Sequence, residues 1–343
     1  MRKLLNTLFV LNPDTYLSLD NNAVLVQQDD KKLQRIPLLQ LEQIYYFGYK
    51  GASPALMGYC ASNNIRLSFI TPKGKFLCAV SGENNGNVLL RKEQYRISDD
   101  EKSAVIIARN FIIGKIYNAR RVLLKAARDH SLRIDIDKVT NINNILSTYI
   151  RSARTSENLA ELRGIEGVAA EQYFSCFDEL VLQQKDDFRF LVRSRRPPLN
   201  RTNALLSFAY VMLANECAAG LSAVGLDPYV GFMHTDRPGR MSLALDLMEE
   251  LRSVIADRLV LSLINTKAVL PHMFEIKENG SCFMNDEGKK AFFTAWQKKK
   301  QETIKHPFLG EKIEWGLIPY VQALLLARYI RGDLDEYPPF FWN

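Results

Sequence analysis

Short apolar segments alternate with turn-forming residues over the first part of the chain. Asn21 and Asn22 separate two such segments and form a hairpin signal, and Ser53 followed by Pro54 is a pattern that opens a helix, here over residues 53–61. The strands predicted from this alternation are 8–11, 16–20, 23–27, 44–47, 65–70 and 75–80. Short strands at this spacing are typical of a compact antiparallel β domain.

From residue 99 onward the apolar positions follow the period of a helix face. Asp99 and Asp100 are suited to cap the first of these helices, and the Arg-Pro-Pro stretch at 196–198 breaks the pattern between two others. Further helices are predicted at 145–150, 159–180, 204–221, 242–263 and 320–329. The sequence therefore predicts an α+β protein, with a small N-terminal antiparallel β domain at residues 1–98 and a larger all-helical C-terminal domain at 99–343.

The overall composition is that of a globular protein. The chain has 343 residues, of which 47% are hydrophobic and 24% charged, and this length allows two domains with separate cores. We find no stretch that is apolar over the length of a membrane span, and polar residues and Pro13 end the first apolar run too early for a signal peptide. We therefore expect a cytoplasmic protein with no membrane association.

The five cysteines are far apart and contain no Cys-x-x-Cys pair. An odd number of cysteines in apolar surroundings is typical of buried free thiols in a reducing compartment. This argues against a disulfide framework or a zinc site.

Basic residues are gathered in two places on a chain of net charge +7. Arg193, Arg195, Arg196 and Arg201 surround a pair of prolines, and a second group consists of Lys289, Lys290, Lys298, Lys299, Lys300 and Lys305. Such clusters can neutralise phosphates, although a single lysine run is more often a solvated face. Two such clusters in one chain, together with the candidate metal site described next, favour a surface that binds nucleic acid.

One histidine and several acids form the strongest candidate for chemistry. An apolar segment brings His234 to a turn rich in Arg, Pro and Gly, and a predicted helix follows with acids at 246, 249 and 250. Positions i, i+3 and i+4 share one helix face, where carboxylates repel one another unless a cation compensates them. A further acid, Glu166, is flanked by Gly164 and Gly167, which leave room beside its carboxylate.

Each residue also has a simpler structural interpretation. Glu166 alone suits a helix start, His234 alone suits a structural hydrogen bond, and Glu249 with Glu250 suits a solvated face. Taken together, the oxygen ligands and one imidazole fit Mn²⁺ or Mg²⁺. Beside basic clusters, the natural reaction of such an ion is phosphodiester cleavage or strand transfer.

Several motifs in order resemble the CRISPR-associated integrase family of spacer acquisition, the first of the two adaptation proteins. They are the segments 164–167, 203–210, 225–234 and 242–250, together with the ending at 322–333. The opening at 5–10 and the segment 46–57 resemble the subtype I-C branch. The resemblance runs the length of the chain.

The resemblance implies a homodimeric, metal-dependent DNA endonuclease and integrase with an N-terminal β domain and a C-terminal helical domain. Together with the small second adaptation protein, it would insert a short double-stranded DNA fragment into a CRISPR repeat by attack of the fragment's 3′-hydroxyl. The family's catalytic metal ligands fall on Glu166, His234 and Glu249, and Asp246 is its additional acid, to which we assign a supporting role. Met241 stands where relatives often carry proline.

The surroundings of the site leave further assignments open. Arg237 and Arg240 follow the histidine and suit phosphate contacts, or alternatively ion pairs with Asp236 or Asp246. Arg193, Arg195 and Arg196 are weaker DNA-binding candidates. For Asn203 and Ser207 we favour hydrogen bonds within the helical core over contacts to DNA.

Two other functions remain possible from the residues. One is a non-catalytic DNA-binding scaffold in which the acids and the histidine are structural. The other is a standalone structure-selective nuclease that acts on branched DNA.

Overall fold

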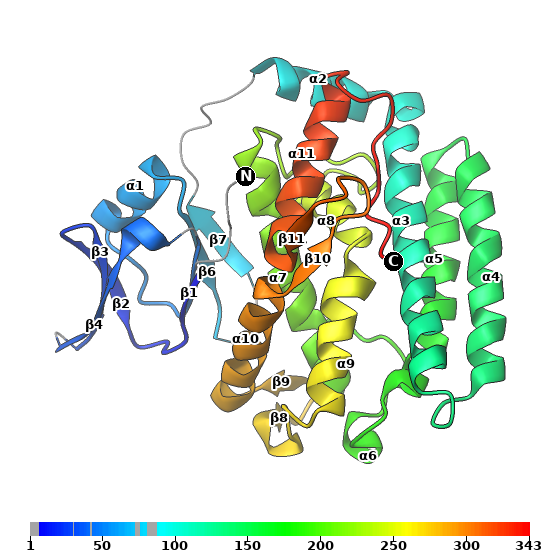
Figure 1. Ribbon diagram of the computed structural model, residues 1–343. Coiled ribbons are helices and arrows are strands. Elements are labelled where there is room, and N and C mark those ends of the chain that lie inside the picture. Colours follow the sequence, from blue (N-terminus) through cyan, green and yellow to red (C-terminus); the bar gives the residue numbers. More distant parts are fainter. Residues whose placement is uncertain (1–6, 30, 42, 73–75, 81–87) are drawn as a thin grey trace. The chain divides into compact units, whose positions relative to one another are not determined.

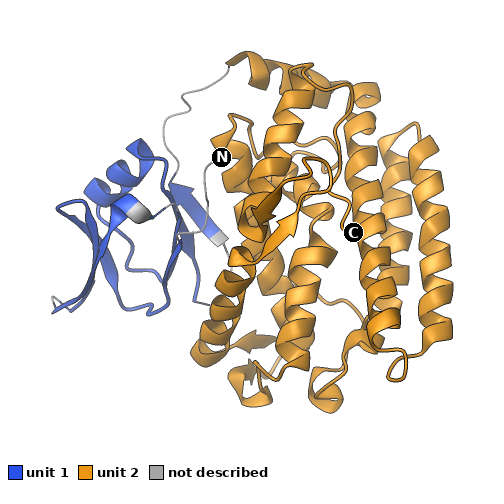
Figure 2. Ribbon diagram, in the orientation of Figure 1, with its two compact units in different colours: residues 1–86 blue, residues 87–343 orange. Residues whose placement is uncertain are grey.

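The computed structural model describes residues 7–29, 31–41, 43–72, 76–80 and 88–343. The chain forms two compact units, residues 1–86 and 87–343 (Figure 2). The predicted boundary at 98/99 falls inside the last turn of helix α2 (Val88–Asp99), which packs on helices α3 and α11 of the second unit. Two predictions fall partly outside the described residues. They are the start of the motif at 5–10 and the first residue of the strand at 75–80.

The first unit contains two β-sheets. A three-stranded antiparallel sheet has the order β2 (Tyr16–Asp20), β3 (Ala23–Gln28) and β4 (Lys31–Pro37), and a four-stranded sheet has the order β1 (Thr7–Val10), β5 (Gln43–Phe47), β6 (Arg66–Ile70) and β7 (Phe76–Val80). Asn21 and Asn22 form the β2–β3 turn, both with positive φ, as the hairpin signal predicted.

The prediction of a purely antiparallel domain is wrong for the four-stranded sheet. β1 pairs with β5 and β5 with β6 in parallel, and only the β6–β7 pair is antiparallel. Parallel neighbours need a crossover connection, which helix α1 (Pro54–Ser62) supplies between β5 and β6. Ser53 caps α1, since its side chain accepts a hydrogen bond from the Leu56 backbone N–H at 3.2 Å.

The second unit is mostly helical (Figure 1). Its α-helices are α2, α3 (Glu101–Asp129), α4 (Ile136–Thr155), α5 (Leu159–Ser175), α6 (Lys185–Phe188), α7 (Arg201–Ala223), α8 (Ser242–Glu249), α9 (Arg258–Asn265), α10 (Asp286–Gln301) and α11 (Ile318–Ile330). Short 3₁₀ turns lie at Phe177–Leu180, Pro271–Met273 and Trp315–Leu317, and a π-helical turn at Arg252–Asp257 joins α8 to α9. Asp100 caps α3, as predicted, by accepting from the Ser103 backbone N–H.

The prediction of an all-helical second domain is wrong in detail. Two short antiparallel hairpins occur there, β8 (Phe274–Ile276) with β9 (Cys282–Met284), and β10 (Thr303–Lys305) with β11 (Lys312–Glu314). Strands of three residues are too short to show a reliable alternating pattern in the sequence.

Helix α7 lies at the centre of the second unit and packs on α8, α9, α11 and the π-helical turn. Contrary to the sequence analysis, α7 is long and apolar enough to cross a membrane, although 78% of its most apolar window is buried by the rest of the protein. A mostly buried helix of this kind is what the core of a soluble protein contains. Around this core, α3, α4 and α5 run side by side, and α3 packs on α8.

Candidate metal and catalytic site

Helix α8 supplies two buried carboxylates one turn apart, Asp246 at 0% and Glu249 at 2% exposure. The helix begins at Ser242 without a side-chain cap, and the carbonyl of Pro228 accepts from the Leu243 and Ala244 backbone N–H groups at 3.0 and 3.2 Å. The loop that precedes the helix is thus tied to its first turn. Met241 directly precedes this helix start.

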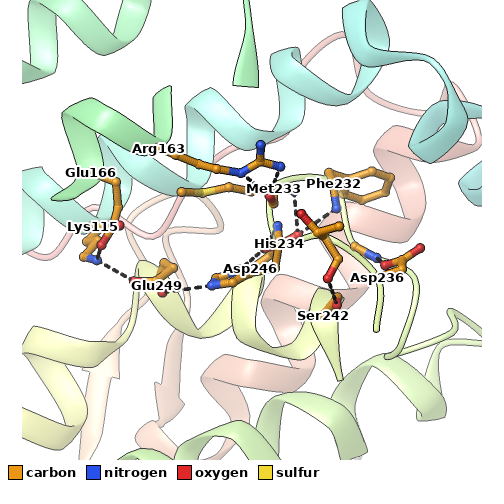
Figure 3. A network of polar contacts seen from close by, with 12 residues as sticks. Lys115, Arg163, Glu166, Phe232, Met233, His234, Asp236, Ser242, Asp246 and Glu249 are labelled. Carbon is orange, nitrogen blue, oxygen red and sulfur yellow. Dashed lines mark hydrogen bonds and ion pairs between the residues drawn. The ribbon is translucent and has the colours of Figure 1, made fainter. Parts of the chain in front are cut away.

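Asp246 organises the loop that carries His234. Its two oxygens accept hydrogen bonds from the backbone N–H groups of Phe232, Met233 and His234 at 2.7 to 3.0 Å. Asp246 Oδ1 also lies 2.5 Å from Nδ1 of the His234 ring, which leaves Nε2 facing Glu249 Oε1 at 4.0 Å (Figure 3). The acid therefore sets the orientation of the imidazole, as a carboxylate behind a metal-binding histidine commonly does.

The close approach of loop and helix requires a glycine at position 231. A Cβ atom there would lie 2.8 Å from Ser242 Cβ and 2.9 Å from Asp246 Oδ2, so any larger residue would push the loop away from α8.

Two other helices hold the same loop. Buried Gln94 of α2 donates to the carbonyls of Asp227 and Val230 at 2.8 Å and accepts from the Asp227 backbone N–H at 2.9 Å. From α5, Arg163 donates to the carbonyl of Met233 at 2.6 and 3.0 Å. The position of His234 is therefore fixed from three sides.

Glu166 points toward this group from the middle of α5, not from a helix start. The ammonium of Lys115, from α3, forms ion pairs with Glu166 Oε1 and with Glu249 Oε2, the second at 2.8 Å. The structure thus joins Glu166 and Glu249 through one lysine, and His234 Nε2 lies 4.0 Å from the other oxygen of Glu249.

Arg252, on the π-helical turn, completes the surroundings of Glu249. Its guanidinium lies 2.8 Å from Glu249 Oε1 and 5.0 Å from the centre of the Tyr210 ring. Burial acts to raise the pKa of Glu249, but the charges of Arg252, Lys115 and His234 outweigh it and lower that pKa to about 2. Glu249 is therefore ionised throughout the physiological pH range.

The sequence analysis did not identify Lys115 or Arg252. Lys115 lies among buried apolar residues of α3, between Ile113 and Ile116, and a lysine in such a position is the signal that was overlooked. The sequence around Arg252 does not single it out in this way. Its contact with Glu249 depends on the π-helical turn that carries it.

The basic residues proposed for DNA binding divide into two kinds. Arg237, Arg195 and Arg196 are exposed, and Arg240 is partly exposed. In the described part of the chain neither Arg237 nor Arg240 pairs with Asp236 or Asp246, and Asp246 is occupied by the His234 loop.

Arg193, in contrast, points inward. It donates to Asn203 Oδ1 at 2.7 Å and to Ser207 Oγ at 3.0 Å, and its guanidinium lies 5.3 Å from the centre of the Tyr210 ring. Asn203 is fully buried, and with Ser207 it takes the core hydrogen-bonding role that the sequence analysis favoured.

The lysine run is also largely internal. Lys300 forms a buried ion pair with Glu216 at 2.7 Å, Lys299 pairs with Glu302 at 2.7 Å, and Lys289 pairs with Asp286 at 2.9 Å. Of this group, Lys290 and Lys298 have exposed side chains on α10.

We tested whether the donors fit a metal ion. Among the described residues, no three His, Cys, Asp or Glu side chains already converge as a metal cluster. The Lys115 ammonium shows that Glu166 and Glu249 can share one positive charge, and His234 Nε2 lies 4.0 Å from Glu249 Oε1. Two carboxylates and an imidazole therefore fit Mg²⁺ or Mn²⁺, provided that Lys115 gives up its place.

The fold and the site define a class: a protein with a β-rich first unit and a helical second unit that carries two carboxylates and a histidine on three elements. Comparison with known proteins identifies the family. The model of the family "CRISPR associated protein Cas1" matches residues 8–298, and the chain belongs to this family. It is 48% identical over 343 residues to the CRISPR-associated endonuclease Cas1 1 of Chlorobaculum tepidum, with both chains covered completely.

Solved structures share the fold. A casposase bound to its integration product matches with a TM-score of 0.84 and 21% identity, over 98% of this chain and 94% of that one. A chain of a Cas6-RT-Cas1–Cas2 complex also matches with a TM-score of 0.84, at 22% identity, over 100% of this chain and 37% of that one.

Proposed function

We propose that this protein is a metal-dependent DNA endonuclease and integrase that inserts short DNA fragments as spacers into a CRISPR array. In the reaction, a fragment's 3′-hydroxyl attacks a phosphodiester of the repeat, and the oxygen of the broken bond leaves as the new 3′-end. The observation that carries this proposal is that Lys115 pairs with both Glu166 and Glu249, while His234 Nε2 lies 4.0 Å from the other oxygen of Glu249, in a chain of the Cas1 family.

We assign Glu166, Glu249 and Nε2 of His234 as the ligands of one Mg²⁺ or Mn²⁺. The ion would supply charge stabilisation at the phosphoryl group and at the attacking and leaving oxygens. Asp246 keeps the His234 ring in the orientation that presents Nε2, and Arg252 holds Glu249 in place and in its ionised form.

The exposed arginines next to the site would position the DNA. Arg237 and Arg240 follow His234 directly, and Arg195 lines a cleft that also contains Lys115 and Arg252. Contacts from arginines to phosphates fix the register of a nucleic acid without reading its sequence.

We further propose that the protein acts on double-stranded DNA in the cytoplasm, as a homodimer together with the small second adaptation protein. The support for this comes from similar proteins: one was solved with its integration product and another in a complex with Cas2. The assignment to the subtype I-C branch stays a prediction from the sequence.

An integration assay tests the proposal. The purified protein and its partner are mixed with a short duplex that has 3′-hydroxyl ends and with a supercoiled plasmid that carries leader and repeat, in Mg²⁺, Mn²⁺ or EDTA. We expect joining that depends on the metal and that is lost in His234→Ala. The control is His272→Ala, because the His272 ring is 60% exposed and pairs with Glu287 at the surface.

Other outcomes would replace the proposal with an alternative. Cleavage of the plasmid that depends on metal but never joins the fragment would favour a nuclease, and activity without the partner on branched DNA would favour a standalone one. DNA binding that is indifferent to metal and to His234→Ala would mean that the acids and the histidine are structural.

A further inference from the structure

Glu250 follows the proposed metal ligand Glu249, but its carboxylate contacts a different part of the chain. It is fully buried, and it accepts hydrogen bonds from the Tyr337 hydroxyl, from the Phe340 backbone N–H at 2.7 Å and from Gln322 Nε2 at 3.0 Å. A buried carboxylate needs such donors. Here the donors tie the segment that carries Tyr337 and Phe340 to the end of α8.

Asn118, on α3, holds the same two places through its amide. Its Nδ2 donates to the Glu250 carbonyl at 2.7 Å and to the Phe340 carbonyl at 2.6 Å, and its Oδ1 accepts from the Trp342 backbone N–H at 2.8 Å. In Figure 1 this end of the chain, drawn in red, runs beside α3. We call Asn118, Glu250 and residues 337–342 the clamp.

The clamp and the metal site share one contact between helices. A Cβ atom at Gly114 of α3 would lie 3.0 Å from Glu250 Cβ and 3.1 Å from Pro339 Cβ, so a side chain at this position would push the clamp away from α3. Lys115 comes directly after this glycine and pairs with Glu249 at 2.8 Å. The distance between α3 and the end of α8 is therefore set on one side by the clamp and used on the other by the site.

The clamp also acts at a break in the helical backbone. Helix α8 ends at Glu249, and the π-helical turn begins at Arg252. The Glu250 carbonyl that Asn118 binds lies between them. Backbone outside a regular helix keeps its position only where tertiary contacts hold it. The clamp thus fixes the backbone that joins Glu249 to Arg252, whose side chains pair at 2.8 Å.

Packing of rings keeps the clamp in place. The Tyr337 ring lies 5.2 Å from the ring of Phe111, on α3, and the guanidinium of Arg258, at the start of α9, lies 4.1 Å from the centre of the Trp342 ring. The segment is therefore attached to α3, to the break after α8 and to α9, and it cannot shift without repacking these contacts.

We propose that the clamp positions the metal site: Asn118 and residues 337–342 hold Glu249 where its carboxylate meets Lys115 and, in the loaded protein, a divalent ion. Asn118, Glu250 and Tyr337 are positioning residues that act through Glu249 and do not touch the ion. Supports behind a metal ligand commonly govern metal affinity in this way. This inference rests on the proposed metal-dependent function.

The test removes hydrogen bonds of the clamp and adds no charge. Asn118→Leu keeps a similar side-chain volume but loses all three backbone contacts, and Tyr337→Phe removes only the hydroxyl that donates to Glu250. The matched control is Asn265→Leu. Asn265, at the end of α9, also makes three hydrogen bonds to backbone groups of a distant segment, residues 180–183, and that segment carries no proposed metal ligand.

Mn²⁺ affinity is measured by titration calorimetry without DNA, and stability by urea unfolding. We expect Asn118→Leu to bind Mn²⁺ about tenfold more weakly than the wild type, and Tyr337→Phe to bind it more weakly by a smaller factor. Asn265→Leu should keep the wild-type affinity although it is also destabilised, because it loses as many hydrogen bonds. If Asn118→Leu does not fold, the milder Tyr337→Phe decides the outcome.

Hydrogen exchange of the metal-free protein gives a second readout. The backbone amides of residues 246–252 should exchange faster in both clamp variants than in the wild type, and at the wild-type rate in Asn265→Leu. This measurement needs neither metal nor DNA. A wild type that binds no Mn²⁺ would defeat the integrase proposal, while the exchange rates would still show whether the clamp holds the backbone beside Glu249.

Two results would overturn the clamp as a positioning device. Wild-type Mn²⁺ affinity and wild-type exchange in both clamp variants would mean that the segment only adds stability. An equal loss of affinity in Asn265→Leu and Asn118→Leu would mean that metal binding follows the stability of the fold and not the position of Glu249.

Discussion

Among single residues, Lys115 neutralises two of the carboxylates proposed as metal ligands. Its ammonium pairs with both Glu166 and Glu249, so a metal ion held by the proposed ligands would compete with the lysine for these carboxylates. We predict that Lys115→Gln binds Mn²⁺ about tenfold more tightly than the wild type, because a positive charge within a few ångströms is removed. Titration calorimetry without DNA measures this.

The matched control for that experiment is Lys125→Gln, on the same helix, whose partner Asp129 lies on the surface. It should leave the affinity for Mn²⁺ unchanged. Weaker binding by Lys115→Gln would instead mean that the lysine holds the two carboxylates in the ligating arrangement.

Asp257 is a second residue whose environment makes a testable prediction. It is buried and accepts from Tyr210 at 2.7 Å and Tyr173 at 3.1 Å. Burial raises its pKa from 3.8 to about 6, against the opposing effects of the two tyrosines, Arg252 and Arg193. The folded state therefore holds this proton more tightly than the unfolded state does.

The stabilisation from that proton is complete below pH 3.8 and is lost as the pH rises through about 6. We predict that the unfolding free energy of the wild type, relative to Asp257→Asn, falls by about 3 kcal/mol across this interval. Urea unfolding of both proteins from pH 4 to 7 tests it. A constant difference would show that Asp257 keeps its ordinary pKa in the fold.

Among the elements, helix α2 has a role that its sequence did not reveal. Its residue Gln94 hydrogen-bonds three backbone groups, at Asp227 and Val230, in the loop that carries His234. We predict that Gln94→Ala lowers the unfolding free energy by about 3 kcal/mol, since it leaves partly buried backbone groups without partners. The affinity for Mn²⁺ should fall as well, because the His234 loop loses a support.

Arg96→Ala provides the comparison on the same helix, since Arg96 pairs with Glu93 in an exposed position. A surface pair of this kind contributes less than about 1 kcal/mol. Equal behaviour of the two variants in urea unfolding and in Mn²⁺ titration would contradict the role given to Gln94.

At the scale of the whole molecule, each unit has a core of its own. That of the first unit includes Leu17, Val24, Ile44, Leu56 and Leu67, all fully buried. The three tryptophans, Trp296, Trp315 and Trp342, all lie in the second unit. Tryptophan fluorescence therefore reports the unfolding of the second unit alone, whereas circular dichroism reports both.

We predict that Leu56→Ala, which opens a cavity under α1, destabilises the first unit by about 3 kcal/mol. The fluorescence transition should keep its midpoint, while part of the circular dichroism signal is lost at lower denaturant concentration. A joint shift of both signals would mean that the two units unfold as one.

The sequence by itself determined the features that depend on neighbouring residues. The Asn21–Asn22 hairpin, the Ser53 and Asp100 caps and the helical second part follow from local conformational preferences and periodicity. It also pointed to Glu166, His234, Asp246 and Glu249, because acids and a histidine with this spacing need compensation. Their family context came from the order of motifs along the chain.

Only the tertiary structure decided what depends on contacts between distant segments. Parallel pairing of β5 with β6 follows from how α1 crosses over between them, and the inward turn of Arg193 follows from its place beside Tyr210. Lys115 meets Glu166 and Glu249 only because α3, α5 and α8 pack together. Such contacts depend on packing over tens of residues, and local sequence patterns carry no record of which partner a charged side chain will meet.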